Sequence, residues 1–249
     1  MFRLTAAADP RHNGAMCANY APSSPDRLRS AFGVEPHRTD YVSDAYPGHV
    51  APMILGVGSA RRAELAVFGL IPPWSRDGLN YRQCYNARCE TVAQKPSFRH
   101  AWKQAQWCVV PADAFYEPCY ETGKAVRWRI ESADGAPLAI AGIHEQWRAP
   151  GGQTVQSFSM LTINADAHPV MNRFHAPGDE KRSVVLLEPG SIDDWLAAEP
   201  EQALALLRAF DPSRVRTASA PRPPRRAKPA SGGTAGANER PSSDTLNFD

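Results

Sequence analysis

The sequence predicts an α+β fold with a mostly antiparallel, barrel-like sheet and short peripheral helices. Strand-like segments follow one another through the second half of the chain, separated by turn signals such as Asp134-Gly135. Helical patterns are short and scattered. No strand–helix–strand alternation and no internal repeat occurs, which disfavours a doubly wound parallel sheet. The 249 residues are sufficient for one large domain with its own core.

The expected strands are apolar runs rich in β-branched and aromatic residues. They are WCVVP (107–111), AVRWRI (125–130), LAIAGIHEQW (138–147), SFSMLTI (157–163) and SVVLL (183–187). The stretch from residue 46 to residue 90 contains the apolar run MILGVG but many turn residues, so we predict it to be loop-rich.

Four short helices are expected. One begins after Ser24 as N-cap with Pro25 in the first helical position, and Gly33 ends it. Phe98 and Trp102, four residues apart, indicate a second helix with one buried stripe. Ser191 has capping-box spacing at the start of a third helix, and EQALALLRAF (201–210) predicts a final amphipathic helix.

The charge is unevenly distributed. Residues 212–249 carry seven basic and three acidic side chains, and residues 1–211 carry 21 basic and 23 acidic ones. The body is therefore not uniformly basic, and a polyanion would need a local patch. We predict an unstructured extension over 1–15 that is absent from the mature protein, a folded catalytic domain over 16–211, and a disordered basic tail over 212–249.

The expected compartment and the expected lack of a cofactor rest on patterns that the sequence does not contain. No apolar run approaches the roughly 20 residues of a membrane span, and the N-terminus has no secretory h-region. Five cysteines without regular spacing argue against a disulfide framework or a structural zinc site. We expect a cytoplasmic protein with no membrane association, no cofactor and no metal; a site built on Cys84 and Cys89 has no supporting spacing.

No phosphate-binding glycine loop, HExxH or GxSxG sequence occurs, which excludes several common enzyme classes. Several polar residues instead stand in apolar, turn-bounded contexts. Each alone has an ordinary explanation: core packing for a cysteine, a salt bridge for a glutamate, a backbone cap for an asparagine. They are Cys17 in MCANY, Asn86 and Arg88 in YNARCE, Glu117 in PADAFYEP and His175 in RFHAPGDEKR.

Eight short sequences in this order resemble the SOS response-associated peptidase (SRAP) family, which processes abasic sites. They are MCANY, FGLIPPW, YNARCET, VVPADAFYEP, AGIHEQW, SMLTINA, RFHAPGDEKR and DDWL, between Met16 and about Ala198. The resemblance implies an α+β fold with a β-barrel-like core. It also implies covalent capture of abasic sites in single-stranded DNA by an N-terminal cysteine, and an autoproteolytic activity that exposes this cysteine.

The resemblance assigns four catalytic residues. The nucleophile is Cys17, the active-site asparagine is Asn86 and the acid/base carboxylate is Glu117. The active-site histidine is His175; His168 is the competing candidate, and we favour His175 because His168 stands too close to the end of the preceding strand.

DNA contacts are implied at four positions. Arg88 corresponds to a phosphate-binding residue, Trp74 to a residue that stacks on bases, and Arg182 follows the active-site histidine. Asn19 stands where members commonly carry Arg, and Phe68 where a Trp often precedes GLIP. The first departure removes one cationic phosphate contact.

The chemistry of an N-terminal cysteine explains this assignment. Its α-amine, with a pKa of about 7.7 to 8.0, forms a Schiff base with the aldehyde of an opened abasic site. Its thiol then closes a thiazolidine ring. Cys17 is internal here, so we expect translation to begin at Met16 with later removal of methionine; the alternative is self-cleavage assisted by Glu117 or His175.

Two other functions compete with this one. A cysteine peptidase acting on other proteins would use Cys17 and His175 as nucleophile and base. A non-covalent single-stranded DNA-binding module would use Trp74, Arg88 and the basic tail. Single-stranded DNA containing abasic sites is the expected partner, and a monomer the expected state.

Overall fold

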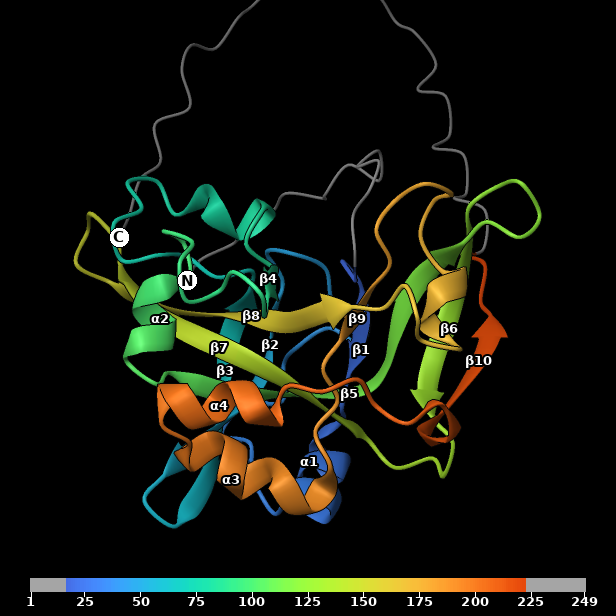
Figure 1. Ribbon diagram of the computed structural model, residues 1–249. Coiled ribbons are helices and arrows are strands. Elements are labelled where there is room, and N and C mark those ends of the chain that lie inside the picture. Colours follow the sequence, from blue (N-terminus) through green and yellow to red (C-terminus); the bar gives the residue numbers. More distant parts are fainter. Residues whose placement is uncertain (1–16, 223–249) are drawn as a thin grey trace, which may run out of the picture.

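A closed five-stranded barrel forms the centre of the protein in the computed structural model, which describes residues 17–222 (Figure 1). The circuit runs β5–β2–β3–β8–β7 and returns to β5. These strands are β2 (Val50–Val57), β3 (Ala60–Phe68), β5 (Trp107–Cys119), β7 (Leu138–Arg148) and β8 (Thr154–Asn164). The predicted extension over 1–15 lies outside the described residues.

Most neighbouring strands are antiparallel, which confirms the predicted α+β class. Two pairings are parallel: β3 with β8, and β4 (Asn86–Arg88) with β8. The prediction of a loop-rich stretch over 46–90 was wrong for residues 50–68, which form the β2–β3 hairpin. The middle of β2 is buried without alternation, so its residues form a continuous apolar run instead of the period-two pattern of a half-exposed strand.

Further strands extend the barrel wall on one side. β1 (Tyr20–Pro22) and β6 (Val126–Ser132) pair with β5, and β9 (Arg182–Val184) pairs with β8. β10 (Val215–Ser219) adds to the free edge of β6, at the side of the molecule where Figure 1 shows these two strands together.

The predicted tail boundary at residue 211 was too early. Residues 212–214 form a 3-10 turn and β10 follows, with all five of its residues in register on β6 and Val215 buried. A strand held by backbone bonds to a neighbour needs few apolar residues of its own, so composition alone did not reveal it. The rest of the predicted tail, residues 223–249, lies outside the described part of the chain.

The helices are short and peripheral. α1 (Pro25–Phe32) has the predicted caps: the Ser24 hydroxyl accepts from the backbone N–H of Arg27, and Gly33 has φ +66°. α2 is Arg99–Lys103, α3 is Ile192–Ala197 and α4 is Pro200–Leu206. The 3-10 turns are η1 (Leu79–Arg82), η2 (Met171–Arg173), η3 (Pro189–Ser191) and η4 (Pro212–Arg214).

Two helix-terminus predictions were wrong. Ser191 makes no side-chain cap to α3, and the capping box belongs to α4, between Glu199 and Gln202. α4 also ends at Leu206, before the predicted residue 210, because Leu207 has extended backbone and Phe210 turns inward to pack on the ring of His168.

The core side chains form two large clusters. One contains Cys17, Tyr20 and Phe68. Phe68 is fully buried and stacks on Phe158 with ring centroids 5.4 Å apart, so it acts as a core residue. The other cluster packs Trp107 against Trp195 beneath α3.

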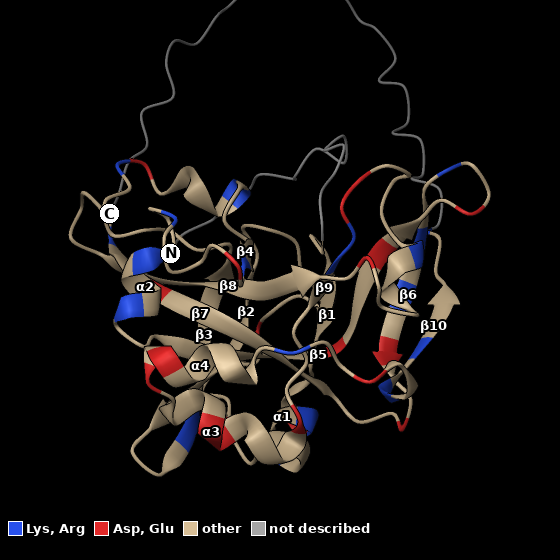
Figure 2. Cartoon of the chain, in the orientation of Figure 1, with Lys and Arg blue, Asp and Glu red and all other residues tan. Residues whose placement is uncertain are grey.

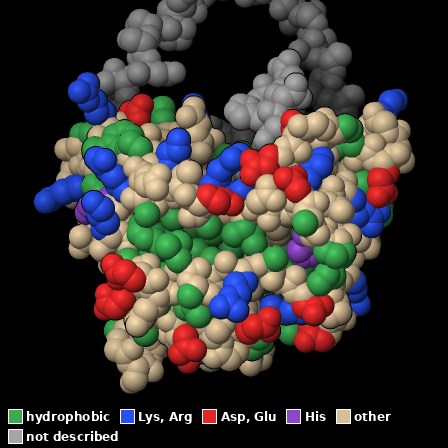
Figure 3. Space-filling view, in the orientation of Figure 1, with side chains coloured by type: hydrophobic (Ala, Val, Ile, Leu, Met, Phe, Trp, Pro, Cys, Tyr) green, Lys and Arg blue, Asp and Glu red, His purple; other side chains and the backbone are tan. Residues whose placement is uncertain are grey.

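Basic and acidic residues are interspersed among the elements of the described chain (Figure 2), and the face in Figure 3 shows basic and acidic side chains mixed. Many of these charges are paired with each other, as in the contact between Arg61 and Asp193. Among residues 17–222, no helix has the length and apolarity to cross a bilayer.

Truncation tests the role of β10. A chain ending at Asp211 should lose about 2 kcal/mol of unfolding free energy relative to one ending at Arg222, because it unpairs the β6 edge and removes the buried Val215. That difference corresponds to a Tm lower by roughly 4 to 8 °C in thermal denaturation. Equal Tm values for the two chains would show that β10 contributes nothing to stability.

Candidate active site

Cys17 and Glu117 meet at the edge of the barrel. The backbone N–H of Cys17 donates to Glu117 Oε1 at 3.0 Å, and the two residues are only 1% and 2% exposed. The pairing of β1 with β5 fixes this contact, since the N–H of Tyr116 donates to the carbonyl of Asn19 at 3.0 Å. A residue near the start of the chain is thereby held against one a hundred positions later.

His175 approaches the same carboxyl group from the loop between β8 and β9. Its Nδ1 lies 3.5 Å from Glu117 Oε2, and its Nε2 donates to the carbonyl of Arg182 at 3.0 Å. The backbone N–H of His175 donates to the carbonyl of Pro118 at 2.8 Å. These bonds hold His175 at φ +66°, a left-handed conformation that is uncommon for non-glycine residues and recurs at active sites.

Burial sets the protonation states of Glu117 and His175. It raises the pKa of Glu117 to about 8, against the opposing effect of the hydrogen bonds from Cys17. Burial and the charge of Lys181 lower the pKa of His175. Near neutral pH the carboxyl group is therefore protonated and the imidazole neutral. The Nε2–H group donates its hydrogen bond to the Arg182 carbonyl, so Nδ1 of the neutral ring carries no proton. Nδ1 therefore faces the protonated Oε2 of Glu117 as an acceptor.

The thiol of Cys17 stays protonated in this environment. Burial, followed by the nearby charge of Glu117, raises its pKa well above the usual value. With 1% of Cys17 exposed, a substrate reaches the sulfur only after the atoms that cover it have moved or been removed.

His168 has a different role. Its Nε2 donates to the carbonyl of Phe210 at 3.1 Å, and its Nδ1 accepts from the backbone N–H groups of Val170 and Met171. Both ring nitrogens hold local backbone together. The structure thus brings His175, and not His168, to Glu117.

Asn86 lies on β4, where it pairs with Met160 of β8. The preceding residue, Tyr85, packs against the core cluster that contains Cys17, and sequence reasoning did not single it out. Its pKa is raised by burial and then by the charges of Cys17 and Glu117, so its hydroxyl lies within their field. Its position directly before Asn86 was the only available signal.

The expected DNA-binding arginines differ in access. Arg88 is 48% exposed and its Nη1 lies 2.7 Å from Glu180 Oε2. Arg182 is 1% exposed and its guanidinium is bound by Glu90, Glu180 and Thr162. This burial argues against a phosphate contact by Arg182 and for a structural role.

Asn19 is also buried, and its amide belongs to a polar network. It donates to Asp44 at 2.6 Å and to the carbonyl of Ala45, and accepts from Arg127 Nε at 2.9 Å. Arg127 lies over the ring of Tyr116, 3.3 Å from its centroid. Sequence reasoning missed Arg127, whose guanidinium the fold brings to Asn19, two residues after Cys17.

Trp74 stands apart from this network. Its side chain is 56% exposed, and its indole N–H donates to the carbonyl of Pro96 at 3.2 Å. An exposed indole with its polar atom already bonded leaves the ring face available for stacking.

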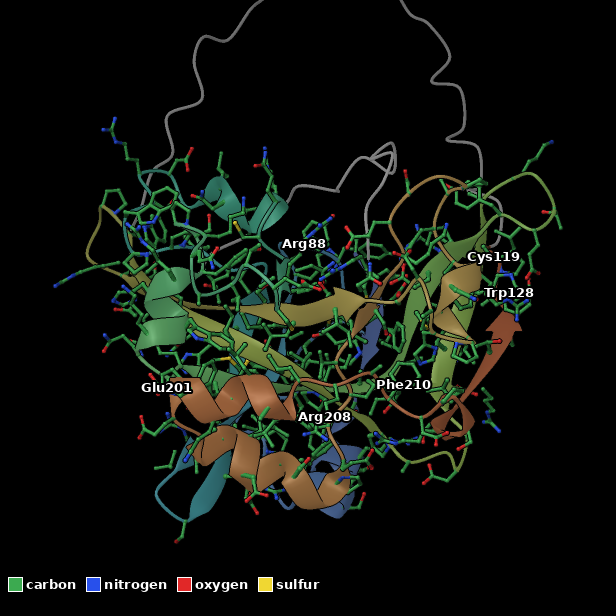
Figure 4. All side chains as sticks on the ribbon, in the orientation of Figure 1. Arg88, Cys119, Trp128, Glu201, Arg208 and Phe210 are labelled. Carbon is green, nitrogen blue, oxygen red and sulfur yellow. The ribbon has the colours of Figure 1, made fainter. Side chains whose placement is uncertain are left out.

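An aromatic residue of β6 stands opposite Glu117. Trp128 pairs with Glu117 in the β5–β6 register, and Arg173 lies 4.5 Å over the Trp128 ring. Figure 4 shows Trp128 and Cys119 on this side of the molecule and Arg88 over β4.

Comparison with known proteins decides the family. The family model described as SOS response associated peptidase (SRAP) matches residues 16–221. The chain belongs to the SRAP family. This SRAP chain is 30% identical over 162 residues to abasic site processing protein YoqW of Bacillus subtilis, an alignment covering 64% of this chain and 69% of YoqW.

More distant and structural relatives agree. The SRAP chain is 28% identical over 176 residues to abasic site processing protein HMCES of Mus musculus, covering 58% of this chain and 48% of HMCES. A crystal structure from Bordetella bronchiseptica matches with a TM-score of 0.76 and 37% identity, covering 82% of this chain and 99% of the other. One from Bacteroides thetaiotaomicron, at 21% identity, a TM-score of 0.71 and coverage of 82% and 91%, shares the fold.

The raised pKa of Glu117 predicts a pH-dependent stability in protein that retains Met16. A raised acid pKa stabilises the fold fully below about pH 4.5, and this contribution is lost as pH rises through about 8. We therefore compare the unfolding free energy of Glu117→Gln with that of wild type by urea unfolding at pH 5 and pH 8.5. The variant's free energy minus that of wild type should be larger at pH 8.5 than at pH 5. The same free-energy difference between variant and wild type at both pH values would contradict a pKa of Glu117 raised by burial.

Proposed function

We propose that this SRAP protein captures abasic sites in single-stranded DNA through Cys17, as a thiazolidine, after the residues before Cys17 have been removed. The observation that carries the proposal is the contact of the Cys17 nitrogen with Glu117 Oε1 at 3.0 Å, with His175 beside the same carboxyl group. The names of relatives such as YoqW and HMCES, abasic site processing proteins, support DNA carrying such a lesion as the substrate.

Release of the preceding residues turns the Cys17 nitrogen from an amide into an amine. At the same position, Glu117 is suited to take a proton from the ammonium form and leave a nucleophilic amine. The new positive charge next to Glu117 would in turn lower the pKa of the carboxyl group from the value of about 8 that it has beside the amide.

The reaction then proceeds with a balance of atoms. The amine attacks the aldehyde carbon of the opened sugar to give a carbinolamine, whose hydroxyl leaves as water with a proton from Glu117. The thiol of Cys17 adds its sulfur to the imine carbon, and its proton passes to the nitrogen. One water is lost overall, and the ring holds both former nucleophiles.

The same contact suits self-cleavage after Met16. Glu117 is protonated near neutral pH beside the peptide nitrogen that would leave, and the Cys17 thiol belongs to the same residue. Sulfur attack on the carbonyl carbon of Met16 and proton donation to the nitrogen would give a thioester, which water then hydrolyses to free both the amine and the thiol.

The remaining residues have supporting roles in the proposal. Exposed Trp74 would stack on a base, which is worth about 1 to 3 kcal/mol in single-strand binding. Arg88 would contact a phosphate, and Asn86 on the same strand would orient the sugar. A single strand needs no unpairing before its sugar can enter.

Protein with a free Cys17 amine, incubated with single-stranded DNA containing one abasic site, should give a denaturant-resistant adduct on a gel. Its mass should equal the sum of the two components less one water, without borohydride reduction. Cys17→Ala should give none, whereas Cys89→Ala, a change in a half-buried cysteine outside the proposed reaction, should react normally. An adduct that forms with Cys17→Ala would disprove the assignment.

Glu117→Gln should slow adduct formation by about 10²- to 10⁴-fold, the usual range for a lost acid/base group, at saturating DNA. His175→Gln should also slow it, while His168→Gln should change the rate only through lost stability. The measurement is the single-turnover rate across pH 5 to 9. Peptidase activity towards other proteins that persists in chains whose Cys17 amine is acetylated would favour the cysteine peptidase, and an adduct formed by such chains would contradict the thiazolidine.

A further inference from the structure

Glu180 is bound to Arg88, the exposed arginine to which the proposed function gives a phosphate. Its Oε2 lies 2.7 Å from Arg88 Nη1, and the two side chains are 36% and 48% exposed. A carboxylate and a phosphate offer the same kind of charged oxygen acceptor to a guanidinium group. Glu180 therefore binds the Arg88 guanidinium in the way that a phosphate oxygen would.

Glu180 is not needed to neutralise its other partner, Arg182. Glu90 binds that buried guanidinium with both carboxylate oxygens, each at 2.8 Å, whereas Glu180 contributes one oxygen at 2.9 Å. If Glu180 moved away, Arg182 would keep a bidentate carboxylate, so no buried charge would be left unpaired. Its departure would thus leave the local fold intact.

We propose that Glu180 competes with DNA phosphate for Arg88: it binds Arg88 in the free protein and is displaced when single-stranded DNA enters. This inference rests on the proposed function and adds a residue that sets the affinity for DNA. Exposed ion pairs of this kind are weak, so a phosphate with several charged oxygens is able to replace the carboxylate.

The segment that carries Glu180 also positions the active-site histidine. Lys181 Nζ donates to the carbonyls of His175 at 3.3 Å and Ala176 at 2.7 Å, and the Arg182 carbonyl accepts from His175. The competing carboxylate is therefore built into the loop beside the reacting group. A competing carboxylate at this position weakens non-covalent binding of every single-stranded DNA. Undamaged DNA therefore dissociates, whereas DNA that is covalently bound at a lesion stays.

Binding of a lesion-free single-stranded oligonucleotide, measured by fluorescence anisotropy, tests the competition without any covalent step. Glu180→Gln should tighten binding by about 1.5- to fivefold, the range expected from the loss of an exposed ion pair. Glutamine still has an oxygen for Arg182 and Asn164, the other partners of Glu180. Arg88→Gln should weaken binding, and the double variant should bind like Arg88→Gln alone.

Two further variants separate competition from simple charge repulsion. Glu180→Asp keeps the charge but withdraws it from Arg88, so it should also tighten binding. Glu121→Gln removes an exposed carboxylate that pairs with Arg173 and should leave the affinity unchanged. Unchanged or weaker binding by both Glu180 variants, or an equal gain in the Arg88→Gln background, would overturn the proposal. Absence of any adduct in wild type would instead refute the proposed function alone.

Discussion

The hydrogen bond from the Cys17 nitrogen to Glu117 is the contact on which the rest of the site depends. It joins the first described residue to Glu117 near the C-terminal end of β5, the strand that pairs with β1, β2, β6 and β7. Because β5 is fixed on several sides by the barrel, the carboxyl group has little freedom to move. The sheet therefore preorganises the carboxyl group, and His175 joins it from the loop between β8 and β9.

Burial gives this contact its chemical character. A carboxyl group in water would be ionised and would hold no proton at neutral pH, whereas burial raises the pKa of Glu117 to about 8. The neighbouring imidazole is held neutral for the same reason, and its second nitrogen is engaged by the Arg182 carbonyl. The carboxyl group that accepts from the Cys17 nitrogen thus carries a proton, and a neutral imidazole lies 3.5 Å from its other oxygen.

The charged residues around the site are arranged to balance one another. Arg182 lies in the interior with Glu90, and Arg127 is bound to Asn19 and Asp44. The body carries no excess of positive charge, so contact with a polyanion depends on individual exposed groups such as Arg88. This explains how a protein with a nearly neutral body is compatible with a nucleic-acid partner.

The sequence by itself determined the α+β class, five strands of the sheet, the caps of α1 and, through ordered short motifs, the family. These features could be predicted because turn residues, helix caps and apolar runs act over only a few positions of the chain. Only the tertiary structure decided that residues 50–68 are strands, that β10 continues the sheet beyond residue 211, and that His175 instead of His168 faces Glu117. Burial of Arg182 and the pairing of Arg88 with Glu180 were likewise invisible, because partners far apart in the chain are chosen by packing and not by spacing.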